Sequence, residues 1–77
     1  MKVLITGTAS GIGKGCAEFF LKENHEVYGF DSNLSMIQHP KYTHFCLDIR
    51  DKGSYPEIGP VDILINNAGV RMEMILM

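Results

Sequence analysis

The stretch that most constrains the fold is residues 2–15, which read KVLITGTASGIGKG. It opens with the apolar run 3–5, whose branched side chains predict a buried strand of a parallel sheet. Three glycines follow, Gly7, Gly11 and Gly13, and the apolar positions then change to helical spacing. A strand, a glycine-rich loop and a helix, in this order, form the setting in which a loop binds phosphate groups.

Each glycine has its own expected role in the pattern T-G-x-x-x-G-x-G, which differs from the commoner G-x-G-x-x-G. Gly7 permits the sharp turn off the strand, Gly11 lets a backbone approach a pyrophosphate, and Gly13 lets the helix pack against the sheet. The free N–H groups and the positive dipole end at the helix start attract phosphate. The alternative is an ordinary glycine-rich turn, and the flanking strand and helix favour the phosphate site.

The helix after the loop is expected over residues 11–23. Either Asn24 or His25 could end it, Asn24 because asparagine accepts the left-handed conformation of a helix C-terminus. The apolar face of this helix is expected to comprise Ile12, Cys16, Phe19 and Phe20.

A second strand is expected over residues 26–30, and its parallel return to the first strand implies a right-handed crossover. Asp31, at the end of this strand, lies 18 residues beyond Gly13. An acidic residue at this place accepts hydrogen bonds from the adenosine ribose and repels a 2′-phosphate. Neither Ser32 nor Asn33 is basic, so NAD is favoured over NADP. The alternative for Asp31 is a turn or helix-capping residue.

Two further strands are expected, over residues 42–47 and 61–65. The connection 34–40 has room for one helical turn at most, and the glycines and prolines of 51–60 exclude a long helix there. Residues 66–69, NNAG, place two amides, a small residue and a glycine at the edge of the sheet where ligands bind. Taken alone, the same residues would be a plain asparagine-rich turn.

Composition excludes several other classes of protein. The seven basic residues are scattered, which disfavours nucleic acid, and no apolar run is long enough to cross a membrane or to form a signal peptide. The chain is therefore expected to be cytoplasmic, with Cys16 and Cys46 as buried thiols. His44, Cys46 and Asp48 alternate along one strand, a poor tetrahedral geometry, so no metal site is expected.

Three stretches agree with one another: TGTASGIG at residues 6–13, Asp48 after the third strand, and NNAG at 66–69. Together they resemble the short-chain dehydrogenase/reductase family in its ordinary branch, and the resemblance covers Lys2–Val70. It implies an α/β fold with a Rossmann-type parallel sheet of about four strands in the order 3-2-1-4, a truncated doubly wound fold. Residues 1–77 would then form a single dinucleotide-binding domain.

The resemblance also implies how NAD(H) is held. The glycine loop would hold the cofactor pyrophosphate, Asp31 would select NAD, and Asp48 would contact the adenine ring. The residues expected to contact NAD are Gly7, Thr8, Ser10, Gly11, Ile12, Gly13, Asp31, Asp48, Ile49, Asn67, Ala68 and Gly69.

The chain departs from the family in its catalytic residues. The family's serine and its Tyr-x-x-x-Lys pair have no counterpart, because Tyr28, Tyr42 and Tyr55 each lack a lysine four residues on. The resemblance therefore implies the NAD(H)-binding portion of an oxidoreductase whose family moves a hydride between nicotinamide and a carbonyl or alcohol carbon. The alternatives are a regulatory nucleotide-binding module without catalysis and a truncated product without function.

The expected sheet has two uncovered surfaces. The fourth strand would be an exposed edge, and one face of the sheet would lack helices. Both features predict a homo-oligomer, formed through that strand or that face. The apolar tail, residues 70–77, is the other candidate for covering a face of the sheet.

Overall fold

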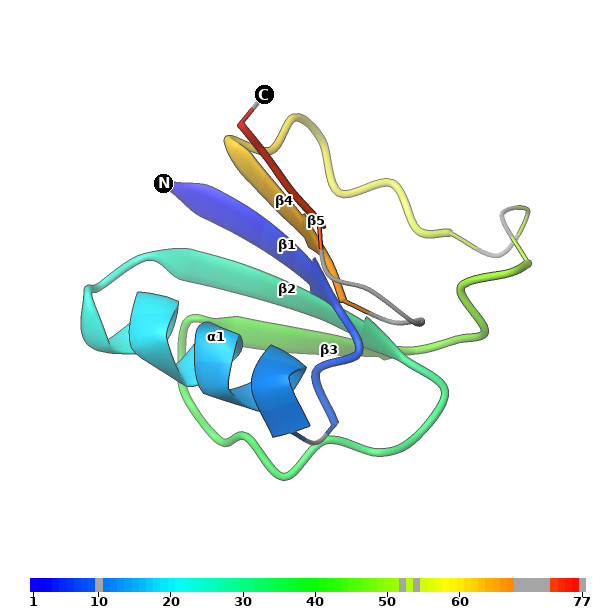
Figure 1. Cartoon of the computed structure of the whole chain (residues 1–77), viewed down its shortest axis with the longest axis horizontal. Coiled ribbons are helices and arrows are strands. Elements are labelled where there is room, and N and C mark those ends of the chain that lie inside the picture. The colour runs from blue at the N-terminus through cyan, green and yellow to red at the C-terminus, as the bar shows by residue number, and fades with distance from the viewer. Residues whose placement is uncertain (10, 52, 54, 68–72, 77) are drawn as a thin grey trace.

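The computed structural model describes residues 1–9, 11–51, 53, 55–67 and 73–76. Its elements in chain order are β1 (Lys2–Thr6), α1 (Gly11–Lys22), β2 (Glu26–Asp31), β3 (Tyr42–Cys46), β4 (Ile63–Asn66) and β5 (Glu73–Leu76). The strands form one sheet in the order β3-β2-β1-β4-β5, and α1 lies over one of its faces (Figure 1). The first four strands are parallel, so the predicted order 3-2-1-4 and the Rossmann-type α/β fold are confirmed.

The core lies between α1 and the central strands. Val3 of β1 pairs in register with Val27 of β2 and with Ile63 of β4, so these side chains share one face of the sheet. All three are buried, whereas Leu4 and Leu64, on the opposite face of the sheet, are half-buried. The buried cluster comprises Val3, Ile5, Ala17, Leu21, Val27, Ile63 and Ile65.

The helix turns a different face to the sheet from the one expected. Ile12 and Phe19 are 66% and 58% exposed, whereas Ala17 and Leu21 are buried. Cys16 and Phe20 of the expected face pack only partly against the core. Near the start of α1 the inner face consists of the small residues Gly13 and Ala17, because a side chain at Gly13 would overlap the carbonyl of Gly7 in the loop after β1.

The end of α1 follows the predicted chemistry. The helix ends at Lys22, and Asn24 adopts the left-handed conformation with φ of 67°. The N–H of Asn24 donates to the carbonyl of Leu21 at 3.0 Å, and the N–H of His25 donates to that of Phe20 at 3.0 Å. This pair of bonds is a Schellman motif, which satisfies carbonyl groups that the helix itself leaves open.

The tail corrects two expectations. Residues 73–76 form β5, which pairs antiparallel with β4 along its whole length, instead of covering a face of the sheet. The fourth strand is therefore not the exposed edge, and pairing of a second copy on β4 is excluded as the contact. The physical reason is that β5 satisfies the backbone N–H and C=O groups that β4 would otherwise leave open.

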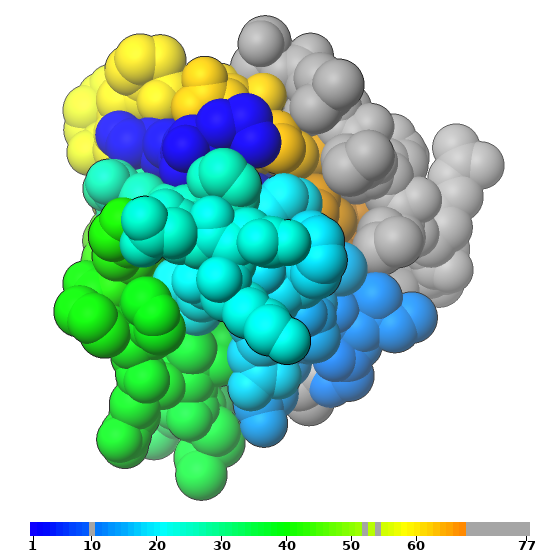
Figure 2. Space-filling view, turned by 90° about the vertical axis from the view of Figure 1, so that its left-hand side faces the viewer, coloured from blue at the N-terminus to red at the C-terminus, as the bar shows by residue number. Residues whose placement is uncertain are grey.

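Part of the face of the sheet opposite α1 is covered by residues 55–58, which form neither helix nor strand. The ring of Tyr55 packs edge-on against Phe30 with centroids 5.2 Å apart, and the Lys2 ammonium donates to the carbonyl of Ile58 at 2.6 Å. Phe30 is only 2% exposed as a result. In the space-filling view, the start of β1 lies between the residues near 60 and the turn before β2 (Figure 2).

The remaining differences from expectation are local. Residues 34–39 contain no helical turn, and Ile37 packs from this connection against the core. Cys46 is exposed and Cys16 is half-buried, so neither is the fully buried thiol expected. Cys46 misses burial because β3 is an edge strand. No helix in the described parts of the chain is long and apolar enough to cross a bilayer.

Candidate functional site

The turn after β1 is as tight as the glycine pattern requires. Gly7 has a φ of 76°, which is strained for other residues, and its N–H donates to the carbonyl of Phe30 on β2 at 2.7 Å. A side chain at Gly13 would overlap the carbonyl oxygen of Gly7 and would lie 2.6 Å from the amide nitrogen of Asn67. The first turn of α1 is therefore seated directly on the loop, and a glycine is needed at residue 13.

Gly11, at the start of α1, faces open space. Its φ is 63°, and a side chain built there would meet no atom within 4 Å. This opening lies at the end of the helix where free N–H groups and the helix dipole favour an anion. The geometry fits the expected approach of a pyrophosphate. Ser10, also expected to contact the cofactor, lies outside the described residues.

Thr6 joins the end of β4 to the glycine loop, a role that the sequence analysis missed. Its hydroxyl donates to the side-chain oxygen of Asn66 at 3.0 Å and accepts the backbone N–H of Asn67 at 2.9 Å. The side-chain amide of Asn67 donates to the carbonyl of Gly7 at 3.3 Å. Asn67 is thus placed beside the loop, whereas residues 68 and 69 lie outside the described part of the chain.

Asp31 fastens the glycine loop to the turn after β2. One carboxylate oxygen accepts the backbone N–H of Ala9 at 3.0 Å, and the other accepts that of Asn33 at 2.9 Å. Asp31 therefore does act as a turn residue, which was the alternative interpretation of its place in the sequence. It leaves room for the ribose role, because each carboxylate oxygen has a second lone pair for a hydroxyl donor.

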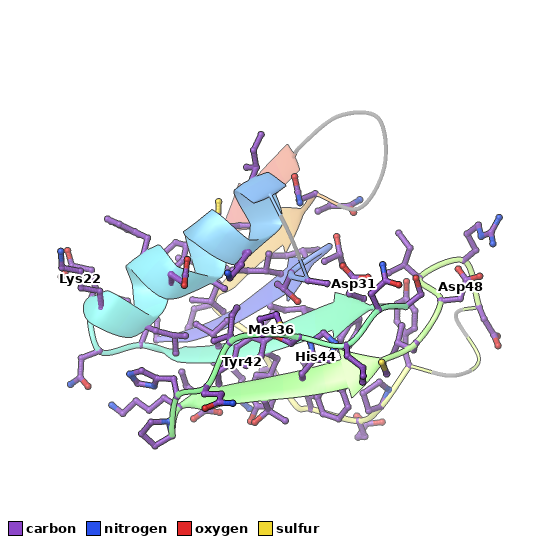
Figure 3. All side chains as sticks on the ribbon, turned by 90° about the horizontal axis from the view of Figure 1, so that it is seen from below. Lys22, Asp31, Met36, Tyr42, His44 and Asp48 are labelled. Carbon is purple, nitrogen blue, oxygen red and sulfur yellow. The ribbon has the colours of Figure 1, made fainter. Side chains whose placement is uncertain are left out.

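Asp48 lies at the same end of the sheet as Asp31 (Figure 3). The Arg50 guanidinium holds it in a two-pronged ion pair, with Nε at 3.1 Å and Nη2 at 2.8 Å from its two oxygens. These hydrogen bonds, with the Arg50 backbone N–H, lower the pKa of Asp48 to about 2 and raise that of Arg50. Asp48 is therefore an ionised acceptor, already paired. The carbonyl of the next residue, Ile49, accepts the Tyr55 hydroxyl at 2.5 Å.

A chain of side chains beneath the loop is the second feature that the sequence analysis missed. The Tyr42 hydroxyl lies 2.8 Å from the Thr8 hydroxyl and 2.7 Å from Nδ1 of His44. The other ring nitrogen of His44 lies 2.8 Å from the carbonyl oxygen of Asn33. The alternation along the third strand predicted that Tyr42 and His44 share a face, but no sequence signal linked them to residue 8.

A hollow of about 450 Å³ lies elsewhere, between the last turns of α1 and the connection before β3. It is lined by Glu18, Leu21, Lys22, Met36, Ile37, Gln38 and His39. None of these residues belongs to the expected cofactor site. We assign the site to the loop end of the sheet, because its backbone donors, glycines and carboxylates suit a dinucleotide and the hollow's lining does not.

Known proteins similar to the chain are oxidoreductases. The 3-oxoacyl-acyl-carrier-protein reductase FabG of Thermotoga maritima is 32% identical over 90 residues, covering 95% of this chain and 37% of the relative. Sorbitol dehydrogenase of Cereibacter sphaeroides is 33% identical, covering 87% of this chain and 32% of the relative. The uncharacterized oxidoreductase YxbG of Bacillus subtilis is 33% identical over 91% of the chain and 32% of its own length. No solved structure matches the chain.

The chain spans about a third of the length of these relatives; the largest share is 37%, for the FabG reductase. The alignment of 90 residues exceeds the 77 of the chain, so the relative carries extra residues within the matched span. This agrees with the short connections before β3 and β4, in whose described residues there is no long helix. The model of the family described as short chain dehydrogenase matches residues 1–76. With the glycine loop, the strand order and these relatives in agreement, the chain belongs to the short-chain dehydrogenase family.

Proposed function

We propose that the chain binds NAD(H) as the cofactor-binding portion of a short-chain dehydrogenase/reductase oxidoreductase, with residues 1–77 as one dinucleotide-binding domain. The observation that carries the proposal is the position of Asp31. Its carboxylate joins the glycine loop at Ala9 to the turn at Asn33. The pyrophosphate-binding and ribose-binding segments of such a site are thereby held together by the residue that would read the ribose.

The described residues fit a dinucleotide at this end of the sheet. The loop from Gly7 to Gly11 and the first N–H groups of α1 would hold the pyrophosphate. Asp31 would accept the hydroxyls of the adenosine ribose, and Asp48 with Ile49 would flank the adenine. The remaining residues of the proposed contact set are Ser10, Ile12, Gly13, Asn67, Ala68 and Gly69. Thr8, which the sequence also suggested, is completely buried and would support the glycine loop from beneath.

Charge supports NAD over NADP. A 2′-phosphate would approach the carboxylate of Asp31, and like charges repel strongly over a few ångströms near a protein surface. The exposed residues that follow, Ser32 and Asn33, bring no positive charge to offset the repulsion. The family as a whole uses both cofactors, so the preference rests on these residues of the chain itself.

The chemistry divides between the cofactor and the chain. Bound NAD(H) supplies the hydride that the family exchanges with a carbonyl or alcohol carbon. The residues of this chain bind and orient the cofactor. Tyr28, Tyr42 and Tyr55 lack the lysine partner that lowers a tyrosine pKa for acid–base work. We therefore propose no proton-transfer step for these residues, and a regulatory module that binds NAD(H) without turnover is the second candidate function.

The test is a calorimetric titration of the purified chain with NAD and with NADP. We expect NAD to bind about tenfold or more tightly than NADP, because the repulsion at Asp31 is worth ~1.4 kcal/mol or more. Asp31→Asn removes the charge and keeps the shape of the side chain. It should weaken NAD binding several-fold and narrow the preference over NADP.

The matched control is Asp62→Asn. Asp62 also accepts a backbone N–H, that of Lys2 at 2.8 Å, but at the opposite end of the sheet. Its substitution should leave both affinities unchanged. Equal binding of NAD and NADP by the unaltered chain, or an equal effect of the two substitutions, would remove Asp31 from the site. Failure of both cofactors to bind would reject the proposed function.

A further inference from the structure

A continuous hydrogen-bonded chain runs beneath the expected cofactor site. It passes from the hydroxyl of Thr8 in the glycine loop, through the Tyr42 hydroxyl and the His44 ring, to the carbonyl of Asn33 in the turn after β2. Figure 3 shows Tyr42 and His44 along β3, beneath the connection that follows Asp31. The two ends of this chain lie in the two segments that Asp31 also joins.

A glycine in strand β2 leaves the space that these hydrogen-bonded side chains occupy. Gly29 pairs in register with His44, and a side chain at Gly29 would overlap the hydroxyls of both Tyr42 and Thr8. A glycine inside a strand weakens the strand and often marks a place where other groups approach closely. Thr8 is completely buried, so its hydroxyl depends on partners within the protein.

We propose that Tyr42 and His44 are positioning residues, which hold the glycine loop through Thr8, and that the charge on His44 sets how firmly Thr8 is held for the dinucleotide. The inference rests on the proposed function, because the loop is taken as the pyrophosphate site. Neither side chain is given a contact with the cofactor itself.

The hydrogen positions follow from the partners. A carbonyl only accepts, so the His44 nitrogen that faces Asn33 carries a hydrogen in both charge states. When His44 is neutral, Nδ1 accepts from the Tyr42 hydroxyl, whose oxygen then accepts from Thr8. When His44 is charged, Nδ1 donates to Tyr42, and Tyr42 must then donate to Thr8. The structure gives Tyr42 as the donor to Thr8; because each hydroxyl can both donate and accept, the pair also permits the reverse direction.

The two states differ at Thr8. In the neutral state each hydrogen of the chain has an acceptor. In the charged state the hydroxyl hydrogen of buried Thr8 loses Tyr42 as its acceptor, and a buried donor without an acceptor is unfavourable. A free loop can adjust, whereas a loop fixed on a pyrophosphate cannot. Dinucleotide binding therefore favours neutral His44 and should weaken as the pH falls.

The titratable groups nearest to His44 come from β3 itself and from the end of β2. Tyr42 and Cys46 lie on its own strand, and Asp31 ends the neighbouring strand β2. Histidine is the side-chain type that ordinarily changes charge between pH 5 and 8, while carboxyl and phenol groups titrate outside this range. Cys46→Ser tests whether the thiol contributes to the pH dependence, and this variant should keep the pH dependence of the unaltered chain.

The first experiment needs no ligand. The backbone amide signal of Thr8 is followed by nuclear magnetic resonance from pH 5.5 to 8, together with the ring signals of His44. We expect the Thr8 amide to shift with the His44 titration in the unaltered chain and not in Tyr42→Phe. Neutral His44 should be the tautomer with its hydrogen on Nε2. Tyr28→Phe is the matched control, because its hydroxyl bonds Glu26 away from the loop.

The second experiment measures NAD affinity by calorimetry at pH 5.5 and pH 8. The unaltered chain should bind about tenfold more weakly at pH 5.5, the size expected for one unsatisfied buried hydroxyl. Tyr42→Phe and Thr8→Val should remove this pH dependence. Thr8→Val keeps the shape of residue 8 and serves if Tyr42→Phe folds poorly, which its amide spectrum shows directly.

The outcomes separate the two proposals. If NAD does not bind at pH 8, the proposed function is wrong, and the Thr8 amide still decides the coupling. A Thr8 signal that ignores His44, or that follows it equally in Tyr42→Phe, overturns the inference. An unchanged pH dependence of NAD binding in both variants also overturns it. The inference is supported if the Thr8 amide follows the His44 titration in the unaltered chain and no longer does so in Tyr42→Phe, and if the pH dependence of NAD binding is lost in Tyr42→Phe and Thr8→Val.

Discussion

At the scale of single residues, the ion pair of Asp48 and Arg50 makes a testable statement. Arg50 hydrogen bonds hold the pKa of Asp48 at about 2, below its ordinary 3.8. A lowered carboxyl pKa contributes to stability above pH 4, and this contribution is lost as the pH falls from 4 to 2. We expect Arg50→Gln to return the Asp48 pKa towards 3.8, measured by carbon nuclear magnetic resonance of its carboxyl group.

The control for this residue-scale prediction is Asp51→Asn, which changes a neighbouring carboxyl group and leaves the Arg50 side-chain bonds to Asp48 in place. It should leave the Asp48 pKa low. An unchanged pKa in Arg50→Gln would mean that the two side chains are separated by water in solution. The pair is 87% and 46% exposed, so its effect on the stability of the chain should be small.

At the scale of elements, α1 tests which side chains support the packing of a helix on the sheet. Leu21 is 5% exposed within the core cluster, whereas Phe19 is 58% exposed. We expect Leu21→Ala to lower the free energy of unfolding by about 3 kcal/mol, because buried leucine leaves a cavity. Phe19→Ala should lower it by less than about 1 kcal/mol. Urea unfolding of the two variants measures both changes, and a larger loss in Phe19→Ala would contradict the helix orientation.

At the scale of the whole molecule, self-association stays a prediction. Strand β4 cannot provide the contact between copies, because β5 pairs with it. Several large apolar side chains lie on the surface, including Phe19 at 58%, Leu34 at 81% and Met36 at 77% exposure. Exposed apolar surface favours association in water. We expect the mass measured by sedimentation equilibrium to rise with concentration and to rise less in Leu34→Ser. A constant mass of 8.6 kDa at all concentrations would contradict the prediction.

The sequence alone was sufficient to predict those features that depend on the conformational preference of one residue or of its immediate neighbours. Gly7 forms the turn off β1, and Asn24 ends α1 in a left-handed conformation. The apolar runs placed four parallel strands, with boundaries within two residues. Asp31 was identified as the residue at the end of β2 because its spacing from the glycine loop is itself a local property.

The tertiary structure decided everything that depends on distant neighbours. The periodicity of α1 could not tell that Ala17 lies inside and Ile12 outside, because this depends on how closely the helix approaches the loop below it. The pairing of β5 with β4 depends on which backbone groups are left unpaired after folding. The contact of Tyr42 with Thr8 joins residues 34 positions apart. Conformational preferences are set by adjacent atoms and are written in the sequence, whereas burial and hydrogen-bond partners exist only once the sheet has formed.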